Sequence, residues 1–396
     1  MKKILFLFAC LAFATGAYSQ KSKVKAASNF YKEPYQQYDK AKEAIDAAVL
    51  DDQTKNSAEA WYYHGLIYAA LYHNDKYGSL CNNCLQTAYS SYKKSIALDP
   101  KSDYAIEINA LRIPVLVNQV FKEGVDNFNA AKYDKALTSF EMVHEMVPED
   151  SSAVLNAAFS AERAGQDDKA KVYLEKLLAM GVKDPDNYVT LSGLYRKSGD
   201  NDKALQVIRD GRKVFPDTVS LMYSEINLLL ATNRSSEASE IINKALEKDP
   251  KNESLYLVLG NNYDKLANPH DAAGNELPKP ANSKELMAKA IEVYKKGIEV
   301  NPDNYGLNFN VGAYYFNQAA EQVNAANKIP AAAEAEKVRN QAVQNFKLAQ
   351  PFLEKALATN PKVNQDDQSI YQSTLSSLKE LYARTNQNDK YEKLGK

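Results

Sequence analysis

Alanine recurs every 34 residues in the middle of this chain, at Ala136, Ala170, Ala204 and Ala238. Each alanine follows a short polar segment and opens an apolar-periodic stretch. A fixed period of this length is typical of an α-solenoid, because one pair of helices cannot bury its apolar face alone and must stack on the next pair. The period therefore predicts an all-α solenoid of helix pairs, an architecture that usually binds another macromolecule.

Six prolines follow the same 34-residue period as the alanines. Each of them closes an apolar-periodic helix, because proline cannot continue a helix interior. Their spacings are one or two periods, in three cases lengthened by an insertion. These prolines are Pro100, Pro148, Pro216, Pro250, Pro302 and Pro361.

Around these anchors the residues resemble the tetratricopeptide repeat, whose pattern is an aromatic residue, Leu-Gly and Tyr, and later Ala, an aromatic residue and Pro. The resemblance covers nearly all of the chain after residue 20 and implies a right-handed α-solenoid. Small residues are needed where the two helices of a pair cross closely, so Ile226 at such a place predicts looser packing. Two matching units contain Trp61, Gly65, Tyr68, Ala88, Tyr92 and Pro100, and Tyr256, Leu259, Gly260, Tyr263, Ala290, Tyr294 and Pro302.

The repeat divides residues 20–396 into units within one continuous domain. Their expected bounds are about 22–55, 58–102, 103–150, 151–184, 185–218, 219–252, 253–304 and 305–363, followed by a closing helix pair over 369–394. Four insertions interrupt the register. We expect a loop over 77–87, a helical extension bent at Pro114 over 103–116, an irregular loop over 267–289, and two lengthened helices broken at Pro330 over 319–349.

Residues 1–19 read as a secretory signal peptide. A basic tip of Lys2 and Lys3 precedes an apolar run over 4–14, and the small residues Ala17 and Ser19 suit cleavage before Gln20. The apolar run is too short to span a bilayer as a helix, and no later stretch predicts a transmembrane helix. The leader predicts export, with the periplasm as the destination, and a mature protein that is soluble or peripherally attached to an envelope complex.

The charge balance argues against two classes of partner. The chain has 49 Lys and Arg against 50 Asp and Glu, a formal net charge of −1. Proteins that bind nucleic acid or anionic membranes through electrostatics carry a basic excess. We therefore expect a protein partner and no nucleic acid.

Cys81-Asn82-Asn83-Cys84 is the sharpest local motif. In an oxidising exported compartment it predicts a disulfide between Cys81 and Cys84. A thioredoxin-like role would need a strand–helix setting, which this sequence lacks, and haem attachment is excluded because Leu85 follows the motif. Zinc held with His64 and His73 remains an alternative.

Catalysis has little support in the sequence. His144-Glu145 lacks the second histidine of a zinc protease helix. The chain has no phosphate-binding glycine loop and no strand-to-helix serine motif. We therefore expect a protein that is not an enzyme, with no cofactor and no metal.

In the tetratricopeptide family the first helix of each unit lines a concave groove, and the resemblance assigns groove positions here. The resulting row is apolar and aromatic, with asparagines between. Such side chains belong either to the core or, if exposed, to a protein-binding surface. The predicted groove residues are Asn118, Phe121, Val125, Phe128, Leu155, Phe159, Val189, Arg196, Tyr223, Asn227, Leu257, Asn261, Phe309 and Phe316.

One subclass of the family grips the terminal carboxylate of a peptide with lysines and asparagines. Asn261 and Asn310 match two of these positions, but Leu257 replaces the first lysine, which argues against such a clamp. The sequence favours an adaptor in the cell envelope that binds a protein segment along the groove. The alternatives are a module that binds glycan or peptidoglycan, and a structural subunit of an envelope assembly held through its insertions.

Overall fold

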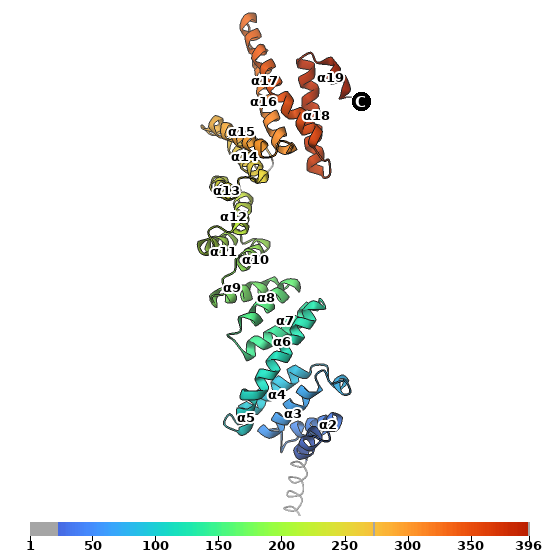
Figure 1. The fold of residues 1–396 in the computed structure, drawn as a ribbon. Helices are drawn as coiled ribbons and strands as arrows, with labels where there is room; N and C mark the ends of the chain where they lie inside the picture. Colours follow the sequence, from blue (N-terminus) through green and yellow to red (C-terminus); the bar gives the residue numbers. More distant parts are fainter. Residues whose placement is uncertain (1–22, 272–273, 395–396) are drawn as a thin grey trace, which may run out of the picture. The chain divides into compact units, whose positions relative to one another are not determined.

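A computed structural model describes residues 23–271 and 274–394, and the predicted signal peptide lies outside them (Figure 1). The chain divides into two compact units, one ending at Lys183 and the other beginning at Asp184. In the described ranges the elements are helices, and the β-structure is limited to one isolated bridge between His270 and Glu276. The predicted fold class, an all-α solenoid of helix pairs, is confirmed. That the solenoid is continuous across Lys183 stays a prediction.

The first unit contains a helix over 23–31 and then consecutive helix pairs. Within a pair the two helices pack against each other, α3 on α4, α6 on α7 and α8 on α9. The helices are α2 (Tyr38–Leu50), α3 (Ala58–Leu71), η1 (Gly78–Leu80), α4 (Cys84–Leu98), α5 (Asp103–Glu107), η2 (Ile108–Arg112), α6 (Ile113–Asn129), α7 (Tyr133–Met146), α8 (Ser151–Arg163) and α9 (Asp167–Ala179).

The second unit continues the same order. Here α10 packs on α11, α12 on α13, α14 on α15, and α16 on α17, and α18 closes against α17. The helices are α10 (Pro185–Lys197), α11 (Asn201–Val214), α12 (Val219–Ala231), α13 (Ser235–Lys248), α14 (Glu253–Ala267), α15 (Ser283–Val300), α16 (Tyr305–Ala326), α17 (Ala332–Thr359), α18 (Gln365–Arg384) and α19 (Asn388–Lys393).

Small residues stand where the helices of a pair cross, as the repeat pattern predicts. A Cβ atom added to Gly65 would lie 2.4 Å from the ring of Tyr92, and one added to Gly260 would lie 2.2 Å from the ring of Tyr294. Both tyrosines are buried. Glycine is therefore required at these two places by the close approach of an aromatic ring, and the contact fixes how the helices of these two pairs cross.

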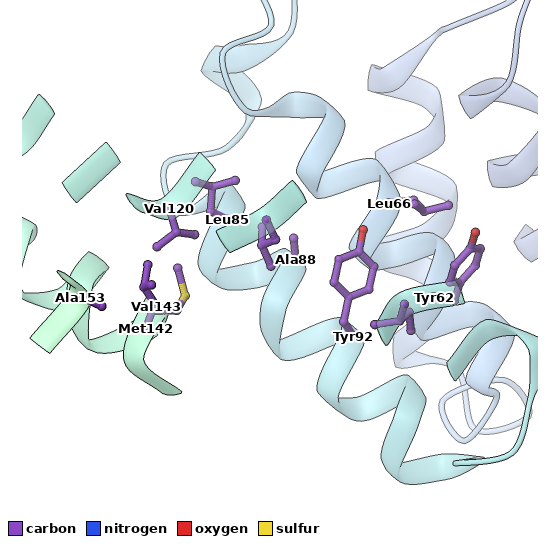
Figure 2. Packing of buried hydrophobic residues seen from close by; sticks show 11 residues of the cluster. Tyr62, Leu66, Leu85, Ala88, Tyr92, Val120, Met142, Val143 and Ala153 are labelled. Atoms are coloured by element: carbon purple, nitrogen blue, oxygen red, sulfur yellow. The ribbon is translucent and has the colours of Figure 1, made fainter. Parts of the chain in front are cut away.

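The core runs along the inner faces of the pairs. In the first unit one cluster joins side chains from α3, α4, η2, α6, α7 and the start of α8, and Figure 2 shows its members, among them Leu85, Tyr92 and Val143. A fully buried side chain of this size contributes about 1.5–3 kcal/mol to the stability of the fold. Each pair thus depends on its neighbour for burial of its apolar face.

The insertion over 103–116 is helical, as predicted, but its irregular part precedes Pro114 instead of lying at it. The turn Ile108–Arg112 is π-helical, between α5 and α6. In a regular α-helix, Pro114 would have no N–H to donate to the carbonyl of Ala110, and its ring would clash with that carbonyl. The wider π-turn accommodates this by adding one residue to the helix.

Two of the other insertions differ from expectation. The segment 77–87 is not entirely a loop, since it contains η1 and since α4 already begins at Cys84. The irregular loop over 267–289 is shorter than predicted, because α14 ends at Ala267 and α15 begins at Ser283. The two lengthened helices over 319–349, α16 and α17, are confirmed. Among the described helices, none combines the length and the apolar character that a membrane span requires.

Candidate functional site

The predicted groove residues lie on the first helices of the pairs, and two positions recur every 34 residues. We call the first position column A and the second column B. Column A comprises Phe121 and Leu155 in the first unit, and Val189, Tyr223 and Leu257 in the second. Column B comprises Val125 and Phe159 in the first unit, and Gly193, Asn227 and Asn261 in the second. Within each unit, the residues of the two columns form what we call the first-helix face of that unit.

In the first unit the face has half-buried apolar side chains. Phe121 packs edge-on against Phe140 of α7, with ring centroids 5.3 Å apart, and Phe128 packs the same way against Tyr133. Val125, Leu155 and Phe159 are also half-buried, and Asn118 is exposed. These aromatic side chains therefore belong to the core on one side and reach the surface on the other.

In the second unit the face becomes more polar. The hydroxyl of Tyr223 accepts a hydrogen bond of 2.8 Å from Asn252 Nδ2, and burial followed by the charge of Asp249 raises the pKa of Tyr223. Asn227 and Arg196 are exposed, whereas Val189 and Leu257 are half-buried. The hydrogen bond holds the ring of Tyr223 in one orientation.

Asn261 is the centre of a small hydrogen-bond network. Its Oδ1 accepts a bond of 2.7 Å from the hydroxyl of Tyr294 and one of 2.9 Å from Asn310 Nδ2. Burial raises the pKa of Tyr294, so this hydroxyl stays protonated and donates. Because Oδ1 is engaged twice, the amide is fixed in orientation and its Nδ2 group is the part left to donate to a ligand.

The last predicted groove residues are on α16. Phe316 packs edge-on against Phe346 of α17, with ring centroids 5.4 Å apart. Phe309 is half-buried against the cluster formed with α17 and α18. Both side chains are held by the core, like the aromatic residues of the first unit.

Cys81 and Cys84 are free thiols in the structure, so the predicted disulfide is not formed there. Cys84 Sγ donates to the carbonyl of Cys81 at 3.2 Å. Burial and the neighbouring Cys81 raise the pKa of Cys84 to about 12, which makes it a poor nucleophile at neutral pH. The disulfide stays a prediction, which the mass change of the exported protein on reduction tests.

His64 is held by packing and hydrogen bonds. Its Nδ1 lies 2.7 Å from Ser91 Oγ, its Nε2 lies 3.3 Å from Asp46 Oδ1, and its ring stacks on Tyr68. Both ring nitrogens thus face side chains other than the cysteines, which argues against a zinc site with Cys81 and Cys84. Within residues 23–271 and 274–394 no three potential ligands are grouped to hold a metal ion.

Sequence reasoning missed two features of the described chain. One is Glu225, a buried carboxylate on α12 that pairs with Arg209 and Arg212 of α11. The other is a row of exposed apolar residues around the π-turn, among them Ile106, Leu111 and Val115. The apolar residues beside Pro114 are visible in the sequence, but the period of a regular α-helix does not place them on one face.

Comparison with known proteins agrees with the repeat. Residues 191–253 match a tetratricopeptide repeat family model, which confirms the resemblance found in the sequence. No curated relative matches the chain. Among solved structures, the MamA protein is 14% identical over 47% of this chain and 92% of its own, with a TM-score of 0.38.

Two further structures are similar at the same level. YrrB, a TPR protein with an unusual peptide-binding site, is 17% identical over 55% of this chain and 95% of its own, with a TM-score of 0.36. The TPR domain of P58(IPK) is 14% identical over 91% of this chain and 99% of its own, with a TM-score of 0.29. At these values the likeness carries no inference about binding.

Proposed function

We propose that this chain, of which residues 191–253 match a tetratricopeptide repeat family model, is a non-enzymatic adaptor that binds a segment of another protein through its first-helix face. The observation that carries the proposal is the half-burial of the apolar and aromatic side chains in columns A and B. Leu155, Phe159 and Tyr223 are each half-buried, so that part of a large side chain reaches the surface.

Half-burial suits a binding surface for an energetic reason. A side chain that is already fixed by the core loses little rotamer freedom when a partner covers it, so more of the contact energy appears as affinity. Phe121, packed against Phe140, and Tyr223, hydrogen-bonded to Asn252, are both held in this way. Aromatic anchors of this kind dominate the energy of protein interfaces.

The amides of the second unit add a different contact. Asn227 and Asn261 are exposed, one repeat apart, and Asn261 has a fixed orientation. Amide groups at a regular spacing are suited to hydrogen-bond the backbone of an extended segment. The first unit therefore offers apolar anchors on its first helices, and the second unit offers backbone-directed donors on its own.

We further propose that the adaptor works in the cell envelope after export. The support is the sequence of residues 1–19, which has the basic tip, apolar run and small residues of a cleaved leader. Fractionation of cells that express the full chain, with the N-terminus of the product sequenced, tests this. A product that begins at Gln20 in the envelope fraction is expected, and an uncleaved cytoplasmic product contradicts it.

The binding proposal is tested by in-cell crosslinking from a photoreactive residue in place of Phe159. The matched control places the same residue at Val172 on α9, which is 60% exposed. One dominant protein adduct from position 159 and none from 172 is expected. The same adduct from both positions, or no protein adduct from 159 in a folded variant, contradicts binding at this face and favours a glycan ligand or the insertions.

A further inference from the structure

One face of the helix that runs from α5 to α6 exposes a contiguous apolar row. Ile106, Leu111 and Val115 are 61%, 58% and 56% exposed, and Ala110 and Pro114 beside them are exposed as well. We call these five residues the apolar stripe. The other large apolar residues exposed in the described part of the first unit stand singly, on separate segments: Tyr35, Leu50, Leu80 and Val172.

The π-turn brings the stripe onto one face. In a regular α-helix, residues five apart do not share a face, because a turn takes 3.6 residues. The turn Ile108–Arg112 is wider, so Ile106 and Leu111 become neighbours along the axis. Val115 follows four residues later, whereas Ile108, Leu116 and Val120 are buried in the core cluster of the first unit.

Exposed charges of opposite sign stand at the two ends of the stripe. Asp103 precedes it on α5 and Lys122 follows it on α6, and both are exposed. Lys122 pairs with Asp126 at 2.6 Å, on an open surface where such a pair contributes little. In the middle, Glu107 is neutralised by Arg112, whose Nε donates to it at 3.0 Å.

This charge pattern is self-complementary. When two such stripes face each other in antiparallel orientation, Asp103 of each copy meets Lys122 of the other, and the contact occurs twice. In a parallel arrangement like charges would meet, which costs energy. A two-fold interface buries the same patch on both copies, so one apolar stripe is enough to build it.

We propose that the apolar stripe is a homodimer interface, in which α5 and α6 of one copy pack antiparallel on those of a second copy. The stripe is small beside the roughly 800 Å² that each partner contributes to a stable complex. The dimer is therefore weak and forms reversibly in the micromolar range. This inference does not rest on the adaptor function, because the five residues of the apolar stripe precede Phe121 and Val125 in the chain, and of the residues that the dimer uses only the charged Lys122 stands between those two.

Sedimentation equilibrium of the mature chain across the micromolar range tests the proposal. Wild-type protein is expected to pass reversibly from monomer to dimer, and Leu111→Glu to remain monomeric with unchanged helicity. Val172→Glu, equally exposed on α9, is the matched control and should dimerise like wild type. A wild type that stays monomeric throughout, or a Leu111→Glu variant that still dimerises, overturns the proposal.

Charge reversal tests the antiparallel arrangement. Asp103→Lys and Lys122→Asp are each expected to raise the dissociation constant several-fold, and the double variant to restore it towards the wild-type value. Asp103 also lies in the first turn of α5, so melting curves accompany each variant to separate helix stability from association. Two single variants whose losses simply add in the double variant overturn the antiparallel pairing.

Discussion

Column B differs in the two units of the molecule. In the first unit it carries Val125 and Phe159, and in the second it carries Gly193, Asn227 and Asn261, at the same position of the 34-residue repeat. At one buried crossing in each unit the partners do not change in this way, because glycine meets a tyrosine ring both at Gly65 and at Gly260. We infer that helix packing restricts which residues can stand at the crossing positions. The residues at surface positions can vary and can therefore suit a ligand.

The largest expected effect on stability comes from disrupting an ion network in the second unit. Glu225 is buried, and its carboxylate pairs with Arg209 at 3.0 Å and with Arg212. Glu225→Ala leaves the largely buried guanidinium of Arg212 without its carboxylate, while Arg209 keeps its ion pair with Glu237, and this is expected to cost about 3 kcal/mol. The second unit should then unfold well before the first.

Tryptophan fluorescence can follow the unfolding of the first unit separately. Trp61 is the only tryptophan of the chain and belongs to the first unit. Its fluorescence transition should stay where it is in Glu225→Ala, while circular dichroism reports an early loss of helix. A Trp61 transition that shifts together with the dichroism would mean that the two units unfold as one.

The next effect concerns the contact between a glycine and a tyrosine ring, which occurs in both units. Gly65→Ala and Gly260→Ala each place a methyl group against a tyrosine ring, and overpacking of this kind is expected to cost about 1–3 kcal/mol. Thermal melting, read at Trp61 for the first variant and by dichroism for the second, measures it.

Gly193 provides the matched control for both glycine variants. A Cβ atom added there meets no atom within 4 Å, and Gly193 lies inside α10. Gly193→Ala should therefore stabilise the protein, by about 0.5–1 kcal/mol, through helix propensity alone. Equal losses in all three variants would contradict the close-crossing account.

Binding is expected to depend more on the apolar half of column B than on its amide half. Once a partner is identified, Phe159→Ala should weaken its binding by about 1.4 kcal/mol or more, a factor of ten. Asn261→Ala should cost about 0.5–1.5 kcal/mol, the contribution of one hydrogen bond. Isothermal titration measures both, and the reverse order would show that the amide column carries the recognition.

The smallest effect concerns Glu123 on α6. Burial raises the pKa of this carboxyl, against a hydrogen bond from Ser139 that lowers it. The folded state therefore binds the proton more tightly than the unfolded state, and stability is lost as the pH rises from the unfolded pKa through the folded one. Glu123→Gln should stabilise the protein at neutral pH by less than about 1 kcal/mol.

The gain from Glu123→Gln should vanish in acid, below the ordinary carboxyl value, where wild-type Glu123 is protonated in both states. Chemical denaturation at neutral and acidic pH measures this difference, and Glu149→Gln, an exposed carboxyl, serves as the comparison. A gain that is the same at both pH values would contradict the role of burial.

Residues that repeat were predictable from the sequence, and residues that depart from the repeat were not. Gly65 and Tyr92 follow the 34-residue pattern, so their contact could be expected before the fold was known. Pro114 predicts a local break, but the width of the π-turn, and with it the alignment of Ile106 with Leu111, depends on how the neighbouring helices pack. Glu225 occupies a buried position where the pattern favours an apolar residue, and its partners lie on another helix.

The first-helix face is proposed to bind a protein segment. The most direct measurement is hydrogen–deuterium exchange of the chain with and without the partner captured from position 159. The account predicts slower exchange in α8 and α12, which carry Phe159 and Asn227, and little change in α9 and α13. Protection confined to the second helices of the pairs, or to the lengthened ends of α16 and α17, would contradict it.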